Sequence, residues 1–314
     1  MFRACILAAC LSGCTGTAPP GGSAVDAPAG GTGDGPGGGN PDAPAGSLEG
    51  GTLTVSWMHG SASCQTNTDP EVQVHAYNAT VHIIRQNKCK TFEAPFVYVI
   101  EGQTKVLVID SGATNTTALR TAIRTLVPTK PIIVAHSHNH GDHKAGDPAF
   151  VGQPNTTVVS TTIAAVQAQF GITTWPTTPG SIDLGGRVLD VIGIPGHEPQ
   201  HIAFYDRTTG ILCTGDTLYP GLLFINDWAA YRTSVARLAQ FVTSHPITHV
   251  LGAHIEMTAT AKQVYPYGTT YQPNEHALPL TAAHVMELDA ALTQLGATAP
   301  ANPVAHDDFV IDPQ

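Results

Sequence analysis

The chain has 314 residues, only 12% of them charged, and a formal net charge of −10 without any cluster of lysine or arginine. Nucleic acid is not an expected partner, because proteins bind its phosphates through clustered basic side chains. No stretch after the N-terminus is apolar over the length that a bilayer-spanning helix requires. The length suffices for one large domain or two small ones.

Residues 1–14 have the pattern of a bacterial export signal. A positive start at Arg3 is followed by a short apolar run from Ala4 to Leu11. Leu-Ser-Gly-Cys at positions 11–14 then resembles a lipobox, in which cleavage before Cys14 leaves that cysteine lipid-modified. The alternative is an ordinary secretory signal with incidental cysteines. Both predict export, either as a lipoprotein of the bacterial cell envelope that contacts the membrane only through Cys14, or as a periplasmic or secreted protein.

Residues 15–50 are a low-complexity run of glycine, proline, alanine and aspartate with little to bury, which predicts a flexible linker. We expect the folded domain at residues 51–296 and a C-terminal tail at residues 297–314. Because an exported protein matures in an oxidising compartment, Cys64 and Cys89 are expected to form a disulfide. The third cysteine of the folded part lies in an apolar run and is expected to be a buried free thiol.

From residue 51 onward, short apolar runs alternate with segments of helical pattern. This alternation predicts one domain with a layered α/β architecture. Asn115 is expected to cap the first helix. The predicted strands cover residues 96–100, 105–109, 131–135, 156–160, 187–194, 200–205, 211–214 and 248–251, and the predicted helices cover residues 115–126, 161–170, 231–244 and 281–295.

Residues 136–143 read His-Ser-His-Asn-His-Gly-Asp-His directly after a predicted strand. Neutral imidazole and carboxylate are ligands that zinc and similar divalent ions select. A solvated histidine-rich turn is the alternative. His136 fits no ligand position and is expected to be structural or to support a ligand. The pattern His-x-His-x-Asp-His predicts four ligands on a loop, namely His138, His140, Asp142 and His143.

Three later predicted strands also run into a potential ligand, which is His197, Asp216 or His254, with a glycine nearby in each case. The loops after strand ends are where ligands collect in α/β folds. Taken alone, a histidine or aspartate at such a place is more often a turn residue or a helix cap. Its recurrence beside the histidine-rich loop favours one shared metal site.

In this order, the motifs resemble those of the metallo-β-lactamase superfamily over roughly residues 95–260. The resemblance implies a four-layer αβ/βα sandwich with two divalent metal ions at one edge, expected to be zinc, with iron or manganese as alternatives. Asp110 matches the acidic residue of the first motif and would support a ligand, a role for which Glu256 and His136 are further candidates. The implied ligands are His138, His140 and His197 for the first ion, Asp142, His143 and His254 for the second, and Asp216 as the bridge.

The chain departs from the family pattern at two positions that leave the ligands intact. Lys144 and Ala145 follow the loop where the family usually has glycine, and Glu198 follows His197 where threonine or serine is usual. Asp216 as the bridge resembles the glyoxalase II and lactonase branches, because the true β-lactamases generally carry cysteine or serine there. Several aromatic residues are either the lining of a pocket or ordinary core and surface side chains, namely Tyr219, Phe224, Trp228, Tyr265, Tyr267 and Tyr271.

These features predict a metal-dependent hydrolase acting on a small molecule. A hydroxide held by two metal ions would attack an ester, lactone, thioester or amide, and Asp142 would orient it. Two alternatives remain open: a mono-iron oxidoreductase of the same fold, such as a persulfide dioxygenase, and a surface lipoprotein that binds metal without catalysis. Structural zinc sites are closed and usually rich in cysteine, which favours catalysis for this cysteine-free set. The oligomeric state is left open.

Overall fold

The computed structural model describes residues 47–314, so the predicted signal with Cys14 and most of the predicted linker lie outside the described residues. The described part contains two mixed sheets of six strands each and a small sheet of three strands. The last residues of the predicted linker already contact the domain, since the amide of Glu49 donates to the carbonyl of Thr208. Among the described residues, no helix is both long and apolar enough to cross a bilayer.

The first sheet runs in sequence order from one edge to the other. Its strands are β1 (Val72–Ala76), β2 (Val81–Gln86), β3 (Phe96–Glu101), β4 (Val106–Ile109), β5 (Ile132–Ala135) and β6 (Thr156–Val158). The first four are antiparallel, whereas β4, β5 and β6 are parallel. Every residue of β4 is buried, as expected for a parallel strand covered on both faces.

The second sheet is ordered β13-β12-β10-β9-β8-β7. Its strands are β7 (Gly180–Asp183), β8 (Val188–Gly193), β9 (Ile202–Asp206), β10 (Ile211–Gly215), β12 (His249–Gly252) and β13 (Pro279–Leu280). Strands β10 and β12 are parallel, so their carboxyl ends meet at one edge. The third cysteine, Cys213, is buried in β10 as a free thiol, as its apolar surroundings predict.

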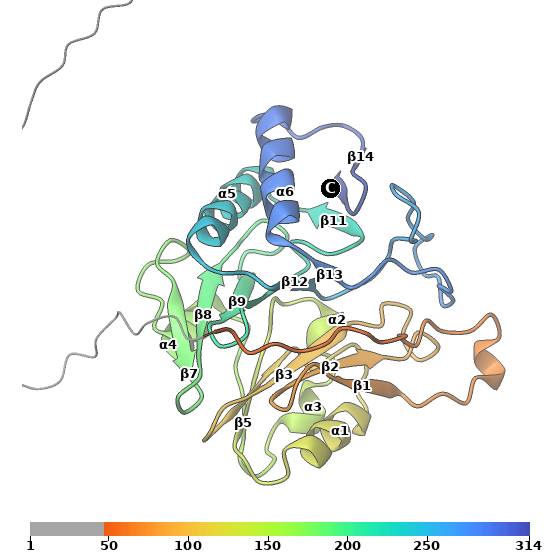
Figure 1. Ribbon diagram of the computed structural model, residues 1–314, viewed down its shortest axis with the longest axis vertical. Coiled ribbons are helices and arrows are strands. Elements are labelled where there is room, and N and C mark those ends of the chain that lie inside the picture. Colours follow the sequence, from red (N-terminus) through yellow and green to blue (C-terminus); the bar gives the residue numbers. More distant parts are fainter. Residues whose placement is uncertain (1–46) are drawn as a thin grey trace, which may run out of the picture. The chain divides into compact units, whose positions relative to one another are not determined.

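Helices cover the outer face of each sheet (Figure 1). They are α1 (Ala118–Leu126), α2 (Gly141–Lys144), α3 (Asp147–Phe150), α4 (Ile163–Phe170), α5 (Trp228–Ser244) and α6 (Ala282–Leu295), with one 3-10 turn, η1 (Cys64–Thr66). One apolar core joins the facing sides of the two sheets, a second joins the first sheet to α1 and α3, and a third joins the second sheet to α5 and α6. The order of layers is therefore helix, sheet, sheet, helix, and the predicted αβ/βα sandwich is confirmed.

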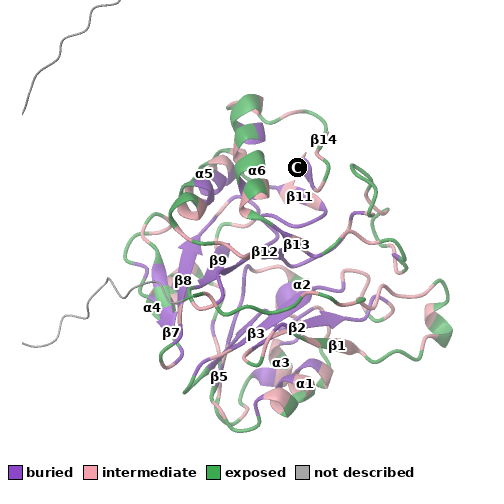
Figure 2. Cartoon of the chain, viewed as in Figure 1, coloured by how far each residue is buried: buried purple, intermediate pink, exposed green. Residues whose placement is uncertain are grey.

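The burial pattern explains why α5 lies where it does. Its buried residues recur at helical spacing, at Tyr231, Ser234, Val235 and Leu238, so one stripe faces the sheet while the opposite side faces solvent (Figure 2). The carboxylate of Asp227 accepts from the amide of Ala230 and caps the first turn. The helix thus begins three residues before the predicted start at residue 231.

The first predicted helix differs at its start. Helix α1 begins at Ala118 with Thr117 as its N-terminal flanking residue, so Asn115 is not its cap. The predicted C-terminal tail is built into the domain: β14 (Val304–Ala305) pairs with β15 (Val310–Pro313), which pairs in parallel with β11 (Leu222–Ile225). Asp308 lies between β14 and β15, and its carboxylate contacts two imidazoles, with His276 Nε2 at 2.8 Å and His284 Nε2 at 3.1 Å.

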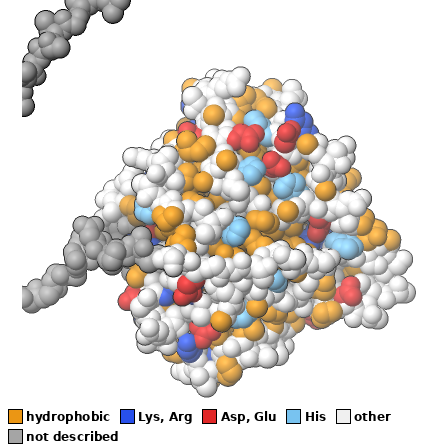
Figure 3. All heavy atoms as spheres, in the orientation of Figure 1, with side chains coloured by type: hydrophobic (Ala, Val, Ile, Leu, Met, Phe, Trp, Pro, Cys, Tyr) orange, Lys and Arg blue, Asp and Glu red, His pale blue; other side chains and the backbone are white. Residues whose placement is uncertain are grey.

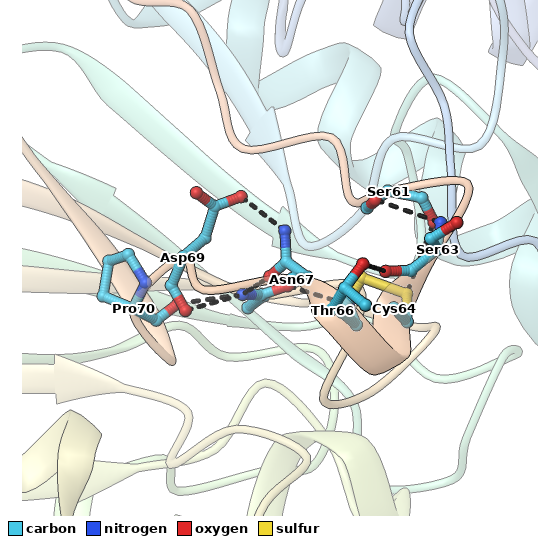
Figure 4. The surroundings of a disulfide bond; sticks show 9 residues. Ser61, Ser63, Cys64, Thr66, Asn67, Asp69 and Pro70 are labelled. Atoms are coloured by element: carbon cyan, nitrogen blue, oxygen red, sulfur yellow. Dashed lines mark hydrogen bonds between the residues drawn. A yellow bond between two sulfur atoms is a disulfide. The ribbon is translucent and has the colours of Figure 1, made fainter.

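Cys64 and Cys89 are joined by a disulfide, the pairing that the sequence predicts. It ties η1 to the loop after β2, and Asn67 beside it donates to Asp69 over 2.8 Å (Figure 4). On the face drawn in Figure 3, lysine and arginine side chains are few and scattered. The disulfide fixes the start of a loop that reaches the candidate site through Phe92 and Glu93.

Candidate metal centre

The predicted ligands meet where strand ends of both sheets face each other. Asp110 follows β4 and the histidine-rich loop follows β5, whereas His197, Asp216 and His254 follow β8, β10 and β12. The chain turns sharply before His197, at Gly196, whose φ is +142° and whose added Cβ would lie 2.4 Å from the Cα of Tyr231. Glycine is required there because any side chain would collide with α5.

The first group of ligand atoms consists of His138 Nε2, His140 Nδ1 and His197 Nε2, which lie 3.0 to 3.2 Å from one another. Asp216 Oδ2 lies 3.6 Å from the nitrogens of His138 and His197. In a tetrahedral zinc site with bonds of about 2.0–2.1 Å, two ligand atoms lie about 3.3 Å apart. The observed spacings match that arrangement.

The second group is built around Asp142, His143 and His254. Asp142 Oδ2 lies 3.1 Å from His143 Nε2 and 3.2 Å from His254 Nε2. Asp216 also reaches both of these imidazoles, each at 3.4 Å. The same aspartate therefore belongs to both groups, and within each group all ligand atoms lie within 4.8 Å of one another.

The ligand set fits two divalent ions on the chemistry of its own atoms. Asp216 is buried, and its Oδ1 has no hydrogen-bond partner among the described residues. A buried carboxylate oxygen without a partner is costly unless a cation or donor meets it. Burial opposes its ionisation, but the imidazoles of His143 and His254 hold the pKa of the Asp216 carboxyl well below its usual range.

Charge and burial also set the protonation of the imidazoles. Burial and the neighbouring rings hold the pKa of His138 well below its usual value, which leaves the neutral form that binds metal. Burial opposes protonation of His254, but Asp216 and Asp142 raise its pKa to about 9. In the metal-free chain, that proton compensates the two carboxylates, and binding of a cation must displace it.

Each ligand imidazole is held by its other nitrogen. His143 Nδ1 lies 2.9 Å from Asp110 Oδ2, the supporting role that the resemblance implies for this aspartate. Asp110 Oδ1 also accepts from the amide of Ser137 over 2.7 Å, and Ser137 Oγ lies 3.0 Å from His138 Nδ1. Asp110 has a φ of +69°, an uncommon conformation for a side-chain-bearing residue that is typical of functional sites.

Three supporting groups carry no motif in the sequence. The carbonyl of Phe224 accepts from His197 Nδ1 over 2.7 Å, and the carbonyl of Glu93 accepts from His254 Nδ1 over 3.1 Å. The carboxylate of Glu198 lies 3.1 Å from His140 Nε2. Glu198 is the departure after the third motif, so the chain uses that position to orient an imidazole.

Two predicted supporting residues contact no ligand. His136 Nε2 lies 2.8 Å from the carboxylate of Asp147, which also accepts from the hydroxyl of Ser111. This histidine therefore links the histidine-rich loop to α3. Glu256 accepts from the hydroxyl of Tyr219 and the amide of Leu222, and only the Tyr219 ring packs against His254. His136 is therefore structural, which is one of the two roles expected for it, whereas Glu256 reaches the ligand His254 only through the ring of Tyr219.

The two groups open into a pocket of about 690 Å³. Of the six aromatic residues considered as its lining, Tyr219, Phe224 and Tyr267 do line it. We call its sides beyond the ligands the pocket wall, formed by Phe92, Glu93, Tyr219, Phe224, Glu256 and Tyr267. Trp228, Tyr265 and Tyr271 lie elsewhere.

A layered αβ/βα sandwich with two histidine–aspartate groups sharing one carboxylate defines a metallo-hydrolase type of site. The family described as "Metallo-beta-lactamase superfamily" matches residues 91–254, and the chain belongs to it. The prediction of an enzyme of the metallo-hydrolase class is thereby confirmed at the level of the family.

Curated relatives are named as hydrolases of hydroxyacylglutathione or as a thioesterase of acyl-coenzyme A. A hydroxyacylglutathione hydrolase of Aeromonas hydrophila is 28% identical over 191 residues, covering 60% of this chain and 70% of that protein. An acyl-coenzyme A thioesterase of Gallus gallus is 26% identical over 219 residues, covering 56% of this chain and 77% of that protein. Further hydroxyacylglutathione hydrolases match over only 58% of their length. Among solved structures, a metallo-beta-lactamase from Pontibacter korlensis aligns at a TM-score of 0.49 with 17% identity, over 71% of this chain and 99% of that one.

Proposed function

We propose that the protein is an exported hydrolase that uses two zinc ions to cleave an ester, lactone, thioester or amide of a small molecule. The observation that carries the proposal is the pair of cysteine-free ligand groups joined by Asp216. Closed structural zinc sites usually have four ligands and are rich in cysteine, whereas this set opens into a pocket. Two divalent ions bound there would lower the pKa of a water and polarise the scissile carbonyl.

The chain's own residues supply position and proton handling. His138, His140 and His197 would hold one ion, Asp142, His143 and His254 the other, and Asp216 both. Asp142 lines the pocket as well as facing His143 and His254, so its carboxylate would also accept a hydrogen bond from the attacking water.

Export is supported by two features of the chain. The first 14 residues have the pattern of a signal ending at Cys14. The Cys64–Cys89 disulfide suits an oxidising compartment. Expression in a bacterial host with Cys14→Ala as the control tests the anchor: the unchanged chain should enter the membrane fraction and take up labelled fatty acid, and the variant should do neither. Labelling of both chains, or of neither, would contradict lipidation at this cysteine.

The test of the reaction is metal analysis combined with a panel of esters, lactones, thioesters, phosphodiesters and β-lactams on the same sample. We expect two zinc ions per chain and turnover of a carbonyl compound. His138→Ala and Asp216→Ala should each lose metal and turnover together, because each removes a ligand. His136→Ala removes an imidazole of the same loop that contacts Asp147 instead, and it should retain the metal.

Several outcomes would overturn the proposal. Retained turnover in both ligand variants would contradict the ligand assignment. One iron per chain with oxygen uptake on a persulfide would favour the oxidoreductase. A metal-replete protein that cleaves nothing in the panel would favour a metal-binding protein without catalysis.

A further inference from the structure

The carboxylates of the pocket wall lie beyond the metal ligands and give the cavity its charge. Two divalent ions would more than offset the negative charges of Asp142 and Asp216, so a negative contribution to the cavity can come only from residues beyond the ligands. Glu93 and Glu256 line the same cavity without facing a ligand imidazole through their carboxylates. Glu198 lies beside His140 but does not line this cavity. Burial raises the pKa of Glu93 and of Glu256, and Asp142 adds to the effect on Glu93, but these two carboxyl groups remain the acidic groups that a substrate meets on the wall away from the ions.

The two lysines nearest the pocket wall, Lys88 and Lys144, do not line the cavity. Among the described residues that line the pocket, none is a lysine or an arginine. Lys144, next to the ligand His143, donates its ammonium to the side-chain oxygen of Asn139. Lys88 is 2% exposed and donates to the carbonyl of Phe92 over 2.7 Å, so its ammonium lies behind the wall and does not line this cavity, although its charge acts on Glu93 and Glu256.

The remaining wall is aromatic. Phe92 and Tyr267 meet edge to face with ring centroids 4.9 Å apart, and Tyr267 is 78% exposed at the mouth of the pocket. The Tyr219 ring lies against His254 deeper in. Aromatic faces carry negative charge density and attract cations, which adds to the effect of the glutamates.

We infer that the substrate carries no anionic group, and that a cationic alcohol or thiol portion is favoured over a neutral one. The inference rests on the proposed hydrolase function and names its substrate class. It separates this chain from relatives named for thioesters of glutathione and coenzyme A, since glutathione carries carboxylates and coenzyme A carries phosphates. A pocket without lysine or arginine on its wall offers those anions no partner.

The experiment uses three thioesters with one butyryl group and one scissile bond. S-butyrylthiocholine is cationic, S-butyryl-N-acetylcysteamine is neutral and S-butyrylglutathione is anionic. With the zinc-replete full chain, kcat/KM should fall in that order, by about tenfold or more from the cationic to the anionic substrate at low salt. The ratio should shrink as salt is added, because screening weakens the field.

Glu93→Gln should lower the cationic-to-anionic ratio severalfold, while the carbonyl of residue 93 still accepts from His254. The matched control is Asp289→Asn, which removes one carboxylate from α6 at a separate cavity beside Arg232 and should leave the ratio in place. A glutathione thioester cleaved as well as the cationic one, or an equal loss of the ratio in both variants, would overturn the inference while leaving the hydrolase intact. No turnover of any of the three would overturn it together with thioester hydrolysis.

Discussion

The ligand groups and the pocket wall face the same cavity, yet different kinds of chain build them. The ligands follow the ends of β5, β8, β10 and β12, and backbone carbonyls, carboxylates or, for His138, the hydroxyl of Ser137 hold the outer nitrogens of the imidazoles. The wall comes mostly from loops, namely the loop after β2, the segment before β11 and the long loop from Glu256 to Tyr267, with Phe224 on β11 itself. A rigid centre on strand ends beside a wall made mostly of loops lets the wall change while the chemistry stays.

The difference also appears in what each region does with charge. The centre brings imidazoles and carboxylates within 4.8 Å, an arrangement that favours cations. The ammonium of Lys88 is buried behind the wall, whereas Glu93 and Glu256 line the cavity. Burial, and then the neighbouring guanidinium of Arg85, lower the pKa of Lys88 to about 8.

The largest effect is expected from Lys88. An unfolded lysine takes up its proton below a pKa of 10.5, whereas the folded chain takes it up only below about 8. Between these values the unfolded chain binds more protons, so the free energy of unfolding rises with pH, and below pH 8 the full cost of burying the ammonium is present. Lys88→Met should remove about 3 kcal/mol of that rise.

The measurement is urea unfolding of the zinc-replete protein at several pH values from 7 to 11, with the Lys88 variant compared with the unchanged chain. Lys90→Met, which removes an exposed ammonium from the same loop, is the matched control. A pH dependence as large in the control as in the Lys88 variant would refute burial as the cause. In that case burial of the Lys88 ammonium would not be what makes stability depend on pH.

Asp110→Asn tests the support of the centre. An amide cannot accept from His143 Nδ1 as a carboxylate does, so the ring is held less firmly and becomes a poorer ligand. We expect zinc affinity to fall by about 10- to 100-fold, measured by competition with a chelator. Asp147→Asn is the control, because Asp147 contacts His136 and Ser111 but no ligand. Equal losses in the two variants would mean that the loop as a whole, and not the carboxylate on His143, sets the affinity.

The same contrast explains what the sequence could predict. The ligand motif, Asp110 and the strands that carry them were predictable, because each ligand follows an apolar run within a few residues. Strands β1 and β2 were missed, although the apolar–polar alternation of residues 72–76 is the pattern of a strand. Strand β15 was not predictable either, because it is fixed by pairing with β11, which lies more than eighty positions earlier. Local patterns record local structure, whereas long-range pairing does not appear in them.

The pocket wall escaped prediction for a similar reason. Phe92 and Glu93 come from a loop without any motif, and only the three-dimensional course of that loop brings them opposite Tyr219. Glu256 shows the reverse error, because it lies near the ligand His254 in sequence but its carboxylate accepts from Tyr219. His136 lies equally close to the ligands, and its contact with Asp147 fits the structural role that was one of its two expected roles. Proximity along the chain predicted the ligands well and the groups around them poorly.

The smallest effect is expected at the mouth of the pocket. Tyr267→Ala removes one ring of the Phe92–Tyr267 pair, and such an edge-to-face contact contributes about 0.5–1.5 kcal/mol. For a butyryl or longer acyl thioester, kcat/KM should fall by about two- to tenfold, with a smaller fall for the acetyl compound, because the longer chain loses more apolar contact. Tyr271→Ala is the control, since Tyr271 lies outside this pocket and packs near His59. If both variants lost activity equally on both chain lengths, the mouth would act through loop stability, and the wall would recognise substrate by charge alone.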